Sequence, residues 1–238
     1  MTSASSGQVR RYLPAQRFIH WVGVGSFLAL LFSGLALLFP PLAFLAAGGF
    51  SRLIHRLAVA PFILLPVLYA VLLPHQAKEL LLESFTYTRD DLEWFKHMPA
   101  YVLGRTKGLP PQGRLNAGQK IHHASTFLMF VTVAASGFVL WFGVGRLGPD
   151  GHALAAMVHD LSMLGLSVLM IGHVYFTFLY EALSGMVTGF VSEQYARMEH
   201  LKWFESLTAA TVAMVPVQST ETPSAASAEA EPAERPQP

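Results

Sequence analysis

The sequence predicts an all-α membrane protein whose core is a bundle of four transmembrane helices. Of its 238 residues, 53% are hydrophobic and only 13% are charged, whereas about a quarter of the residues in a soluble domain are charged. No charged residue lies within residues 18–51, 57–77 or 121–145. Uncharged apolar stretches of about 20 residues are long enough to cross a bilayer core of roughly 30 Å. The chain is therefore expected to be embedded in a lipid membrane.

Four expected spans account for these stretches, at about residues 18–38, 54–73, 121–144 and 153–180. Pro40 and Pro41 end the first span, and a polar connection of residues 74–120 joins the second span to the third. Two pieces of that connection, residues 79–82 and 92–95, are expected to form short helices on the membrane surface.

The segments outside the spans differ in character. Residues 1–16 form a polar N-terminal segment. After the fourth span, apolar residues recur at near-helical spacing, which predicts an amphipathic helix over about residues 190–206. Residues 17–206 are therefore expected to form one domain. The remaining residues, 207–238, are rich in Ala, Pro and Glu, and this tail is predicted to be disordered.

Lysine and arginine residues divide unequally between the two sides of this arrangement. Thirteen of the 16 lie on the side that holds both termini and the long connection, and three lie on the other: Arg52, Arg56 and Arg146. Basic residues are enriched on the cytoplasmic side of membrane proteins. Both termini are therefore expected in the cytoplasm, with the bundle in the inner membrane of a bacterial cell.

The composition also excludes several kinds of site. The chain has no cysteine, which rules out a disulfide framework, a thiolate iron–sulfur cluster and a cysteine zinc site. A net charge of +1 lacks the basic excess that nucleic-acid binding needs. The unusual feature is the ten histidines, because ionisable residues within membrane spans are functional candidates by default.

Four histidines lie within the spans or at their ends: His20, His55, His159 and His173. His159 and His173 are fourteen residues apart, a rise of about 21 Å that returns both rings to nearly the same helix face. His55 matches His159 in depth toward the outer side, and His20 matches His173 toward the cytoplasm. The four therefore predict two haem b groups stacked across the bilayer, each with two axial histidines.

The other histidines fit simpler roles. His122 and His123 at the start of the third span either compete as inner ligands or are solvated at the interface. Solvated positions are expected for the rest: His75, His97, His152 and His200. Gly34 and Gly137, at outer depth, either leave room for a flat macrocycle or pack helix against helix.

Two arginines and one asparagine each have two possible roles. Arg17 and Arg56 each lie near a proposed ligand, where they either pair with haem propionates or flank the spans as ordinary basic residues. Asn116, the only asparagine in the chain, is expected at the cytoplasmic interface. Its amide there either hydrogen-bonds a quinone carbonyl or caps the helix that follows.

These features together resemble the γ subunit of membrane-bound formate dehydrogenase, a dihaem cytochrome b. The resemblance covers about residues 10–206. It is carried by the His159/His173 spacing and by four short segments: Arg11-Tyr12, Arg17-Phe18-Ile19-His20-Trp21, His55-Arg56 and Asn116-Ala117-Gly118-Gln119-Lys120. Cytochromes b of nickel–iron hydrogenases share the four-helix, four-histidine plan but are less similar in the last of these segments.

The resemblance implies a function in electron transport. An iron–sulfur β subunit with one membrane helix would deliver electrons to the outer haem, and a molybdenum- or tungsten-containing α subunit would oxidise formate. The inner haem would reduce a quinone, menaquinone or ubiquinone, near Asn116, Gly118 and Gln119, with His173 bordering the site. The alternatives are the cytochrome b subunit of a nickel–iron hydrogenase or another respiratory oxidoreductase, a histidine-lined membrane transporter, and a purely structural membrane anchor. The spans offer few polar residues besides histidine for a transport pathway, and an anchor would not need four depth-matched histidines.

Overall fold

The computed structural model describes residues 7–214, and its backbone is almost entirely helical. The elements, in chain order, are β1 (Gln8–Arg10), α1 (Pro14–Leu38), η1 (Pro40–Gly49), α2 (Phe50–Leu72), α3 (Pro74–Phe85), α4 (Arg89–Lys96), α5 (Met98–Val102), α6 (Ala117–Phe142), α7 (Pro149–Leu179), α8 (Ala182–Thr188), β2 (Phe190–Ser192), α9 (Glu193–Glu199) and α10 (Leu201–Met214).

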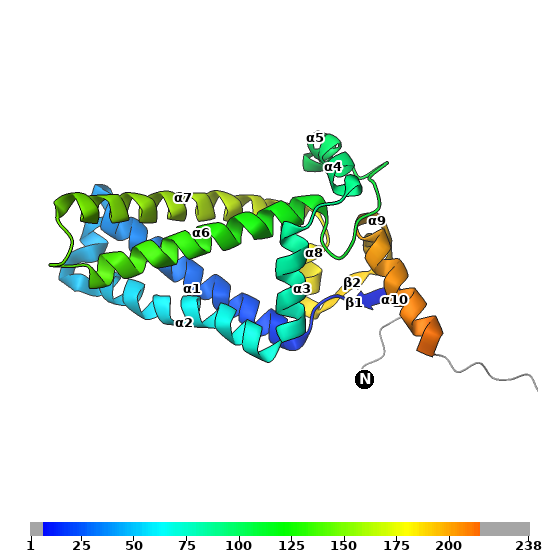
Figure 1. The fold of residues 1–238 in the computed structure, drawn as a ribbon, viewed down its shortest axis with the longest axis horizontal. Coiled ribbons are helices and arrows are strands. Elements are labelled where there is room, and N and C mark those ends of the chain that lie inside the picture. The colour runs from blue at the N-terminus through cyan, green and yellow to red at the C-terminus, as the bar shows by residue number, and fades with distance from the viewer. Residues whose placement is uncertain (1–6, 215–238) are drawn as a thin grey trace, which may run out of the picture.

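The long helices α1, α2, α6 and α7 lie side by side along the molecule (Figure 1). The four candidate membrane spans of the described chain comprise these helices, with η1 continuing into α2, and each is long and apolar enough to cross a membrane. Large apolar side chains point outward along all four, among them Phe32, Leu64, Leu128 and Ile171. An apolar surface of this kind is favourable in contact with lipid and unfavourable in contact with water. The prediction of four membrane-spanning helices is thus confirmed.

Each of the four helices begins four residues before the expected start of its span. The residues of these extra turns are not apolar enough to be recognised as part of a membrane span. Pro14 and Pro149 occupy the first positions of α1 and α7, where the missing N–H and fixed φ suit a helix start. Asn116 caps α6. The expected spans therefore missed the polar first turn of each helix and not its apolar body.

Helices α1 and α2 pack closely as one hairpin, and α6 and α7 pack closely as another. In the first hairpin, η1 turns the chain through Gly48 and Gly49, whose φ values of 69° and 78° lie in the left-handed region. In the second, the short turn of residues 143–148 does the same, with Gly145 at φ 76°. We call the end of the bundle that holds these two turns the loop end.

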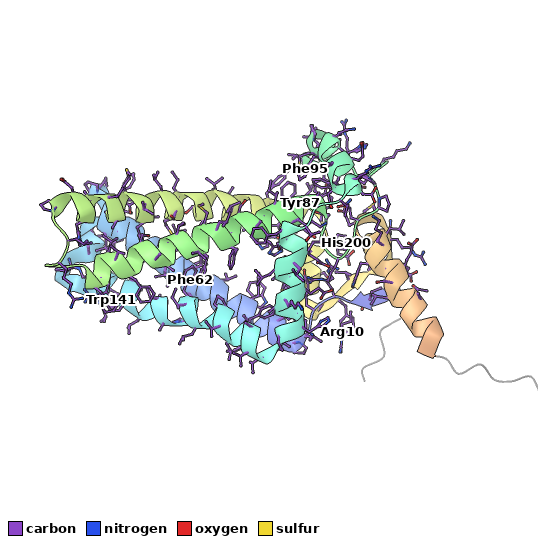
Figure 2. All side chains as sticks on the ribbon, in the orientation of Figure 1. Arg10, Phe62, Tyr87, Phe95, Trp141 and His200 are labelled. Carbon is purple, nitrogen blue, oxygen red and sulfur yellow. The ribbon has the colours of Figure 1, made fainter. Side chains whose placement is uncertain are left out.

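The remaining elements gather at the opposite end, which we call the terminal end (Figure 1). Here β1 pairs antiparallel with β2, so that Val9 lies opposite Val191. Arg11 donates to the carbonyl of Arg114, and Arg17 donates to the carbonyls of Met186 and Val187. Figure 2 shows Arg10 and His200 at this end and Trp141 at the loop end. These contacts tie the first residues to segments more than a hundred positions later.

The expected amphipathic helix over 190–206 is wrong in its extent. Residues 190–192 form strand β2, and two separate helices follow, because His200 adopts a non-helical backbone between α9 and α10. Helix α10 continues to Met214, so residues 207–214 are helical where a disordered tail was expected. The rest of that predicted tail lies outside the described residues. The connection is also more helical than expected, since α3, α4 and α5 occupy much of residues 74–102.

The side of the membrane on which the terminal end lies stays a prediction from the distribution of basic residues. A reporter enzyme that is active only outside the cytoplasm, fused after Phe204, is expected to stay silent. The same reporter placed after Gly145, in the loop-end turn, is expected to be active. The measurement is reporter activity in whole cells, and activity from the Phe204 fusion alone would reverse the orientation.

Candidate haem sites

The structure brings the four predicted histidines together as two pairs, one at each end of the bundle. At the terminal end, His20 of α1 faces His173 of α7, with ring centroids 6.2 Å apart. At the loop end, His55 of α2 faces His159 of α7, with ring centroids 6.3 Å apart. Each pair joins one hairpin to the other. Helix α7 therefore contributes one ring to each site.

These separations suit two imidazoles on opposite sides of one metal ion. A metal–imidazole bond of about 2 Å on each side places the two ring centres roughly 6 Å apart. A closed structural metal site needs more protein ligands than this, and the described residues contain no group of three or more His, Cys, Asp or Glu able to hold a metal. Two histidines with no further ligand fit an iron whose other four ligands come from a macrocycle.

The loop-end pair is oriented by serine residues one helix away. Ser33 Oγ lies 3.0 Å from His55 Nδ1, and it donates its own proton to the carbonyl of Ala29. The serine oxygen must therefore accept a proton from Nδ1. The same geometry recurs at His159, whose Nδ1 lies 3.3 Å from Ser136 Oγ and 3.1 Å from the carbonyl of Val133.

These contacts fix the tautomer of both rings. With the proton on Nδ1, the lone pair is on Nε2, which is the state a histidine needs to bind a metal. The hydrogen bond at Nδ1 also fixes the ring plane. The protein's own hydrogen bonds thus give both rings of the loop-end pair the tautomer and the orientation that metal ligands need.

The terminal-end pair is held differently. His20 Nδ1 is buried and has no hydrogen-bond partner among the described residues. His173 is more exposed than the other three, and the ring of His122 stacks on it at 5.3 Å and 14°. His123 lies next to His122, with ring centroids 5.6 Å apart. The two extra histidines therefore lie beside the terminal-end pair, where His122 contacts a predicted ligand directly.

Two glycines lie against the loop-end rings. A Cβ at Gly34 would lie 3.4 Å from His55 Cε1, and a Cβ at Gly137 would lie 3.2 Å from His159 Cε1. Any larger side chain at Gly137 would meet the imidazole. These glycines therefore permit the rings to take their positions, a more specific role than helix packing alone.

The two hairpins repeat the same residues at a nearly constant spacing. His20, Ser33 and Gly34 of the first hairpin recur 103 positions later as His123, Ser136 and Gly137. His55 recurs 104 positions later as His159. The start of each hairpin is also alike, because Gln16 accepts from the backbone N–H of Leu13 as Gln119 does from that of Asn116. The loop-end site is thus made of equivalent residues from two similar halves.

Asn116 is buried, and its amide is fully used within the protein. Its Oδ1 accepts from the backbone N–H of Gln119 at 2.8 Å, which caps α6. Its Nδ2 donates to the hydroxyl of Tyr101 at 3.2 Å and to Glu199 Oε2 at 3.4 Å. Gly118 lies against Trp94, since a Cβ there would be 2.8 Å from the indole ring. The structure thus gives Asn116 the capping role, and direct contact of these residues with a quinone stays a prediction.

The expectation that His200 is solvated is wrong. Its side chain is fully buried, Nδ1 lies 2.9 Å from the carbonyl of Gly113, and Nε2 faces Arg11 at 3.5 Å. A carbonyl cannot donate, so the proton is on Nδ1. Burial and then the neighbouring Arg11 hold the pKa of His200 well below its usual value, so the ring is neutral. Nothing local in the sequence indicated this, because its partners lie 87 and 189 positions away.

The two arginines near the histidine pairs have protein partners. Arg17 of α1 donates to the carbonyls of Met186 and Val187 in the last turn of α8, and it lies beside Gly189, which follows that helix. The guanidinium of Arg56 lies 5.4 Å from the centroid of the Trp141 ring. Pairing of Arg17 and Arg56 with haem propionates stays a prediction.

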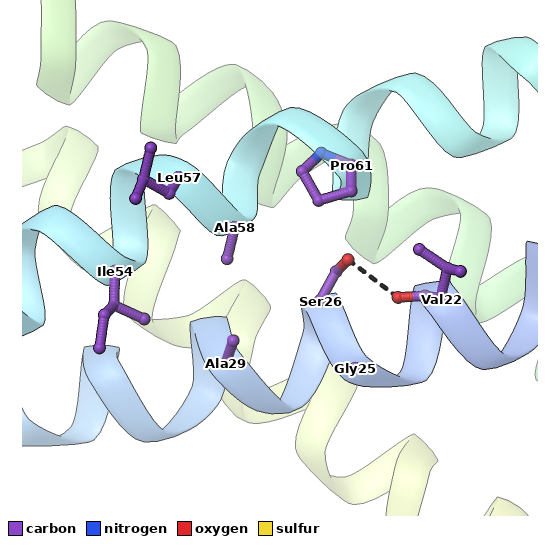
Figure 3. Close-up of a pocket in the computed structure, with 8 residues that line it drawn as sticks. All are labelled: Val22, Gly25, Ser26, Ala29, Ile54, Leu57, Ala58 and Pro61. Atoms are coloured by element: carbon purple, nitrogen blue, oxygen red, sulfur yellow. Dashed lines mark hydrogen bonds between the residues drawn. The ribbon is translucent and has the colours of Figure 1, made fainter.

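An apolar groove of about 500 Å³ lies between α1 and α2 (Figure 3). Its lining includes Gly25, Ala29, Ala58 and Pro61, and its one hydroxyl, Ser26 Oγ, donates to the carbonyl of Val22. No predicted ligand lines this groove. It is therefore separate from the histidine pairs and has no polar group free to orient a ligand.

Comparison with known proteins decides the family. The sequence profile described as prokaryotic cytochrome b561 matches residues 11–189. The chain belongs to this cytochrome b family. The match spans both histidine pairs, and membership implies haem b and electron transport. The resemblance inferred from the sequence is thereby confirmed at the level of the family.

Curated relatives of this cytochrome b are similar over most of their length. The cytochrome b556 subunit of formate dehydrogenase from Haemophilus influenzae is 26% identical over 212 residues, covering 82% of each chain. The cytochrome b556(fdo) subunit of formate dehydrogenase from Escherichia coli K12 is 25% identical, covering 83% of this chain and 92% of the relative. The nitrate-inducible cytochrome b556(Fdn) subunit from the same strain is 22% identical, covering 80% and 88%.

The glycine beside His159 provides a test of the loop-end site. Replacing Gly137 by valine is expected to displace the His159 ring and to lower the b-haem absorbance per protein by about half, because one of the two predicted haem sites would lose a predicted ligand. Gly25→Val is the matched control, since a Cβ at Gly25 meets nothing within 4 Å. Equal haem absorbance in the two purified variants would show that the glycine has no part in the site.

Proposed function

We propose that this chain is the membrane cytochrome b subunit of a formate dehydrogenase, passing electrons from an iron–sulfur partner subunit through two b haems to a quinone on the cytoplasmic side. The observation that carries the proposal is the pair of facing histidine sites, with ring centroids 6.2 Å and 6.3 Å apart, at opposite ends of one bundle. Two such sites in sequence across a membrane serve electron transfer and have no evident use in a structural anchor.

The proposed ligands are His20 and His173 for the terminal-end haem and His55 and His159 for the loop-end haem. The haem iron, when bound, supplies one-electron redox chemistry. Ser33 and Ser136 hold the loop-end rings with Nε2 available. Gly34 and Gly137 leave these rings room. The chain's own contribution is therefore to fix ring orientation and depth within an apolar surrounding.

The names of the relatives support formate as the electron source, because all three described above are formate dehydrogenase subunits. On this proposal the partners are an iron–sulfur β subunit and a molybdenum- or tungsten-containing α subunit, in the bacterial inner membrane. A cytochrome b of a nickel–iron hydrogenase remains the alternative. Reduction of the haems in native membranes by formate, and not by hydrogen, would separate the two.

The quinone, menaquinone or ubiquinone, is proposed to bind at the terminal end beside His173. The His173 ring makes no hydrogen bond within the described chain, so its second nitrogen has no protein partner to displace. A histidine whose one nitrogen binds iron can donate from the other to a quinone oxygen. Asn116, Gly118 and Gln119 are proposed to border this site, with Asn116 positioning the first turn of α6.

Histidine replacements test the ligand pairing. His20→Ala and His173→Ala are expected to lose the same haem, and His55→Ala and His159→Ala the other, because a bis-histidine site fails without either ligand. His75→Ala, at an exposed histidine in α3, is the control and should keep both. The measurement is haem content with the redox spectrum of each purified variant. Retention of both haems in His159→Ala would contradict the assignment.

Replacements at Asn116 test the quinone site. Asn116→Ala loses the cap, at a cost of about 0.5–2 kcal/mol, as well as the amide donor, whereas Asn116→Ser can still cap α6 but lacks the amide. Both variants lose the donor that holds Tyr101 and Glu199, a loss of about 0.5–1.5 kcal/mol per hydrogen bond. Both should therefore keep their haems and show weaker quinone affinity, because the groups that border the proposed site are no longer held in place. The measurement is haem reoxidation by added quinone at several concentrations. Unchanged affinity in Asn116→Ser would leave Asn116 as a cap only.

A further inference from the structure

A carboxyl group is buried behind the N-terminal turn of α6. Glu199, the last residue of α9, is only 2% exposed. Its Oε2 accepts from the hydroxyl of Tyr101 at 3.0 Å and from Asn116 Nδ2 at 3.4 Å. Its Oε1 is buried with no hydrogen-bond partner among the described residues. The carboxyl therefore contacts the cap residue of the helix at which quinone is proposed to bind.

The surroundings of Glu199 are neutral. Its two hydrogen-bond donors are a phenol and an amide, and no cation of the described chain forms an ion pair with it. Trp94, whose ring centroid lies 4.7 Å from that of Tyr101, has a second buried polar atom without a partner, Nε1. Unpartnered buried polar atoms are uncommon in proteins and call for an explanation.

Glu199 is the group in this cluster that titrates near neutral pH. Burial raises the pKa of its carboxyl to about 7, although the hydrogen bonds from Tyr101 and Asn116 oppose the rise. Three tyrosines face it: Tyr101 of α5, Tyr180 after α7 and Tyr195 of α9. Burial and the nearby carboxylate raise the pKa of Tyr101 and of Tyr180, and burial raises that of Tyr195. All three phenols thus stay protonated.

We propose that Glu199 holds the proton that is donated to the quinone at the terminal end. The proposal rests on the proposed function, which supplies the quinone and the electrons. Reduction of a quinone to a quinol takes up two electrons and two protons. The O–H bond of the Glu199 carboxyl breaks as an O–H bond forms on the quinone oxygen. The carboxylate then takes a new proton from the aqueous phase and supplies the second.

The position of Glu199 suits this role. Met198, which precedes it in the chain, is 45% exposed. Helix α9 therefore lies at the surface from which the carboxylate must take up a new proton. His200, the adjacent titratable side chain, is fixed as a neutral ring between Gly113 and Arg11, and its one ring proton is held by the carbonyl of Gly113. The capping contact of Asn116 thus has a second consequence, because it places a titratable acid next to the start of α6.

The test compares haem reoxidation in the full haem-loaded chain and in Glu199→Gln across pH 5.5 to 8.5. The glutamine has nearly the same shape and can accept the same hydrogen bonds, but it carries no acidic proton. The haems are reduced with stoichiometric dithionite, so that no partner subunit is needed, and a short-chain quinone is added. Glu193→Gln is the matched control, because it replaces a partly exposed acid of the same helix that pairs with Arg197.

The expected pH dependence follows from the raised pKa. The carboxyl is protonated below about pH 7 and deprotonated above it. The rate at which quinone reoxidises the haems of the native chain should therefore fall as pH rises through about 7. Glu199→Gln should be slower by on the order of a hundredfold at pH 6 and should lose this pH dependence. Ferricyanide, which takes electrons without protons, should reoxidise both proteins equally fast. A native rate and pH profile in Glu199→Gln would overturn the proposal.

Tyr101→Phe gives an independent readout if Glu199→Gln fails to fold. Removing the hydroxyl removes a hydrogen bond that stabilises the carboxylate, so the pKa of Glu199 rises and the fall in rate should move to higher pH. If the fall in rate has its midpoint at the same pH in Tyr101→Phe as in the native chain, the proposed role of Glu199 is also overturned. If quinone fails to reoxidise the native chain while ferricyanide succeeds, the proposed quinone reduction is what fails.

Discussion

The hydrogen bond between serine and histidine across each hairpin is the interaction on which the loop-end site depends. An imidazole in an apolar surrounding must satisfy its N–H, and Ser33 and Ser136 do so while donating their own protons to backbone carbonyls. The serine can then only accept, which fixes the proton on Nδ1 and leaves Nε2 available. The register of α1 against α2, and of α6 against α7, has to place each serine beside its histidine, and the adjacent glycine gives the ring its room.

The repeat of this unit explains why the two ends of the bundle differ. At the loop end, His55 and His159 are equivalent residues of two similar halves, so the site is nearly symmetric. At the terminal end, the position equivalent to His173 in the first hairpin is Tyr69, which accepts a hydrogen bond from Gln16. His20 therefore pairs with a histidine that has no counterpart, and His123, the counterpart of His20, has no histidine opposite it. The asymmetry leaves His122 and His123 beside the terminal-end pair.

Much of the membrane core was predictable because its determinants are local. Gaps between charges located the four helices, and the spacing of His159 and His173 indicated a common face. The helix starts were missed since proline and asparagine at the first turn carry no hydropathy signal. The surroundings of Glu199 and His200 were not predictable, because Tyr101, Asn116 and Gly113 lie 83 to 98 positions from them. These contacts are nonlocal: β1 pairs with β2, α9 packs against both strands, and Glu199 at the end of α9 reaches the start of α6.

The distribution of protic groups gives the two ends different chemistry. At the loop end, the imidazole protons are engaged by serine and backbone oxygens, and Asp160, which follows His159 in the chain, is exposed. Among the described residues, no carboxyl or phenol hydrogen-bonds either imidazole of this pair. At the terminal end, a carboxyl of raised pKa and three phenols gather around the start of α6 and the end of α7, and α6 itself adds His122 and His123. This difference supports the proposed placement of quinone reduction, which needs protons as well as electrons, at the terminal end and of electron entry at the loop end.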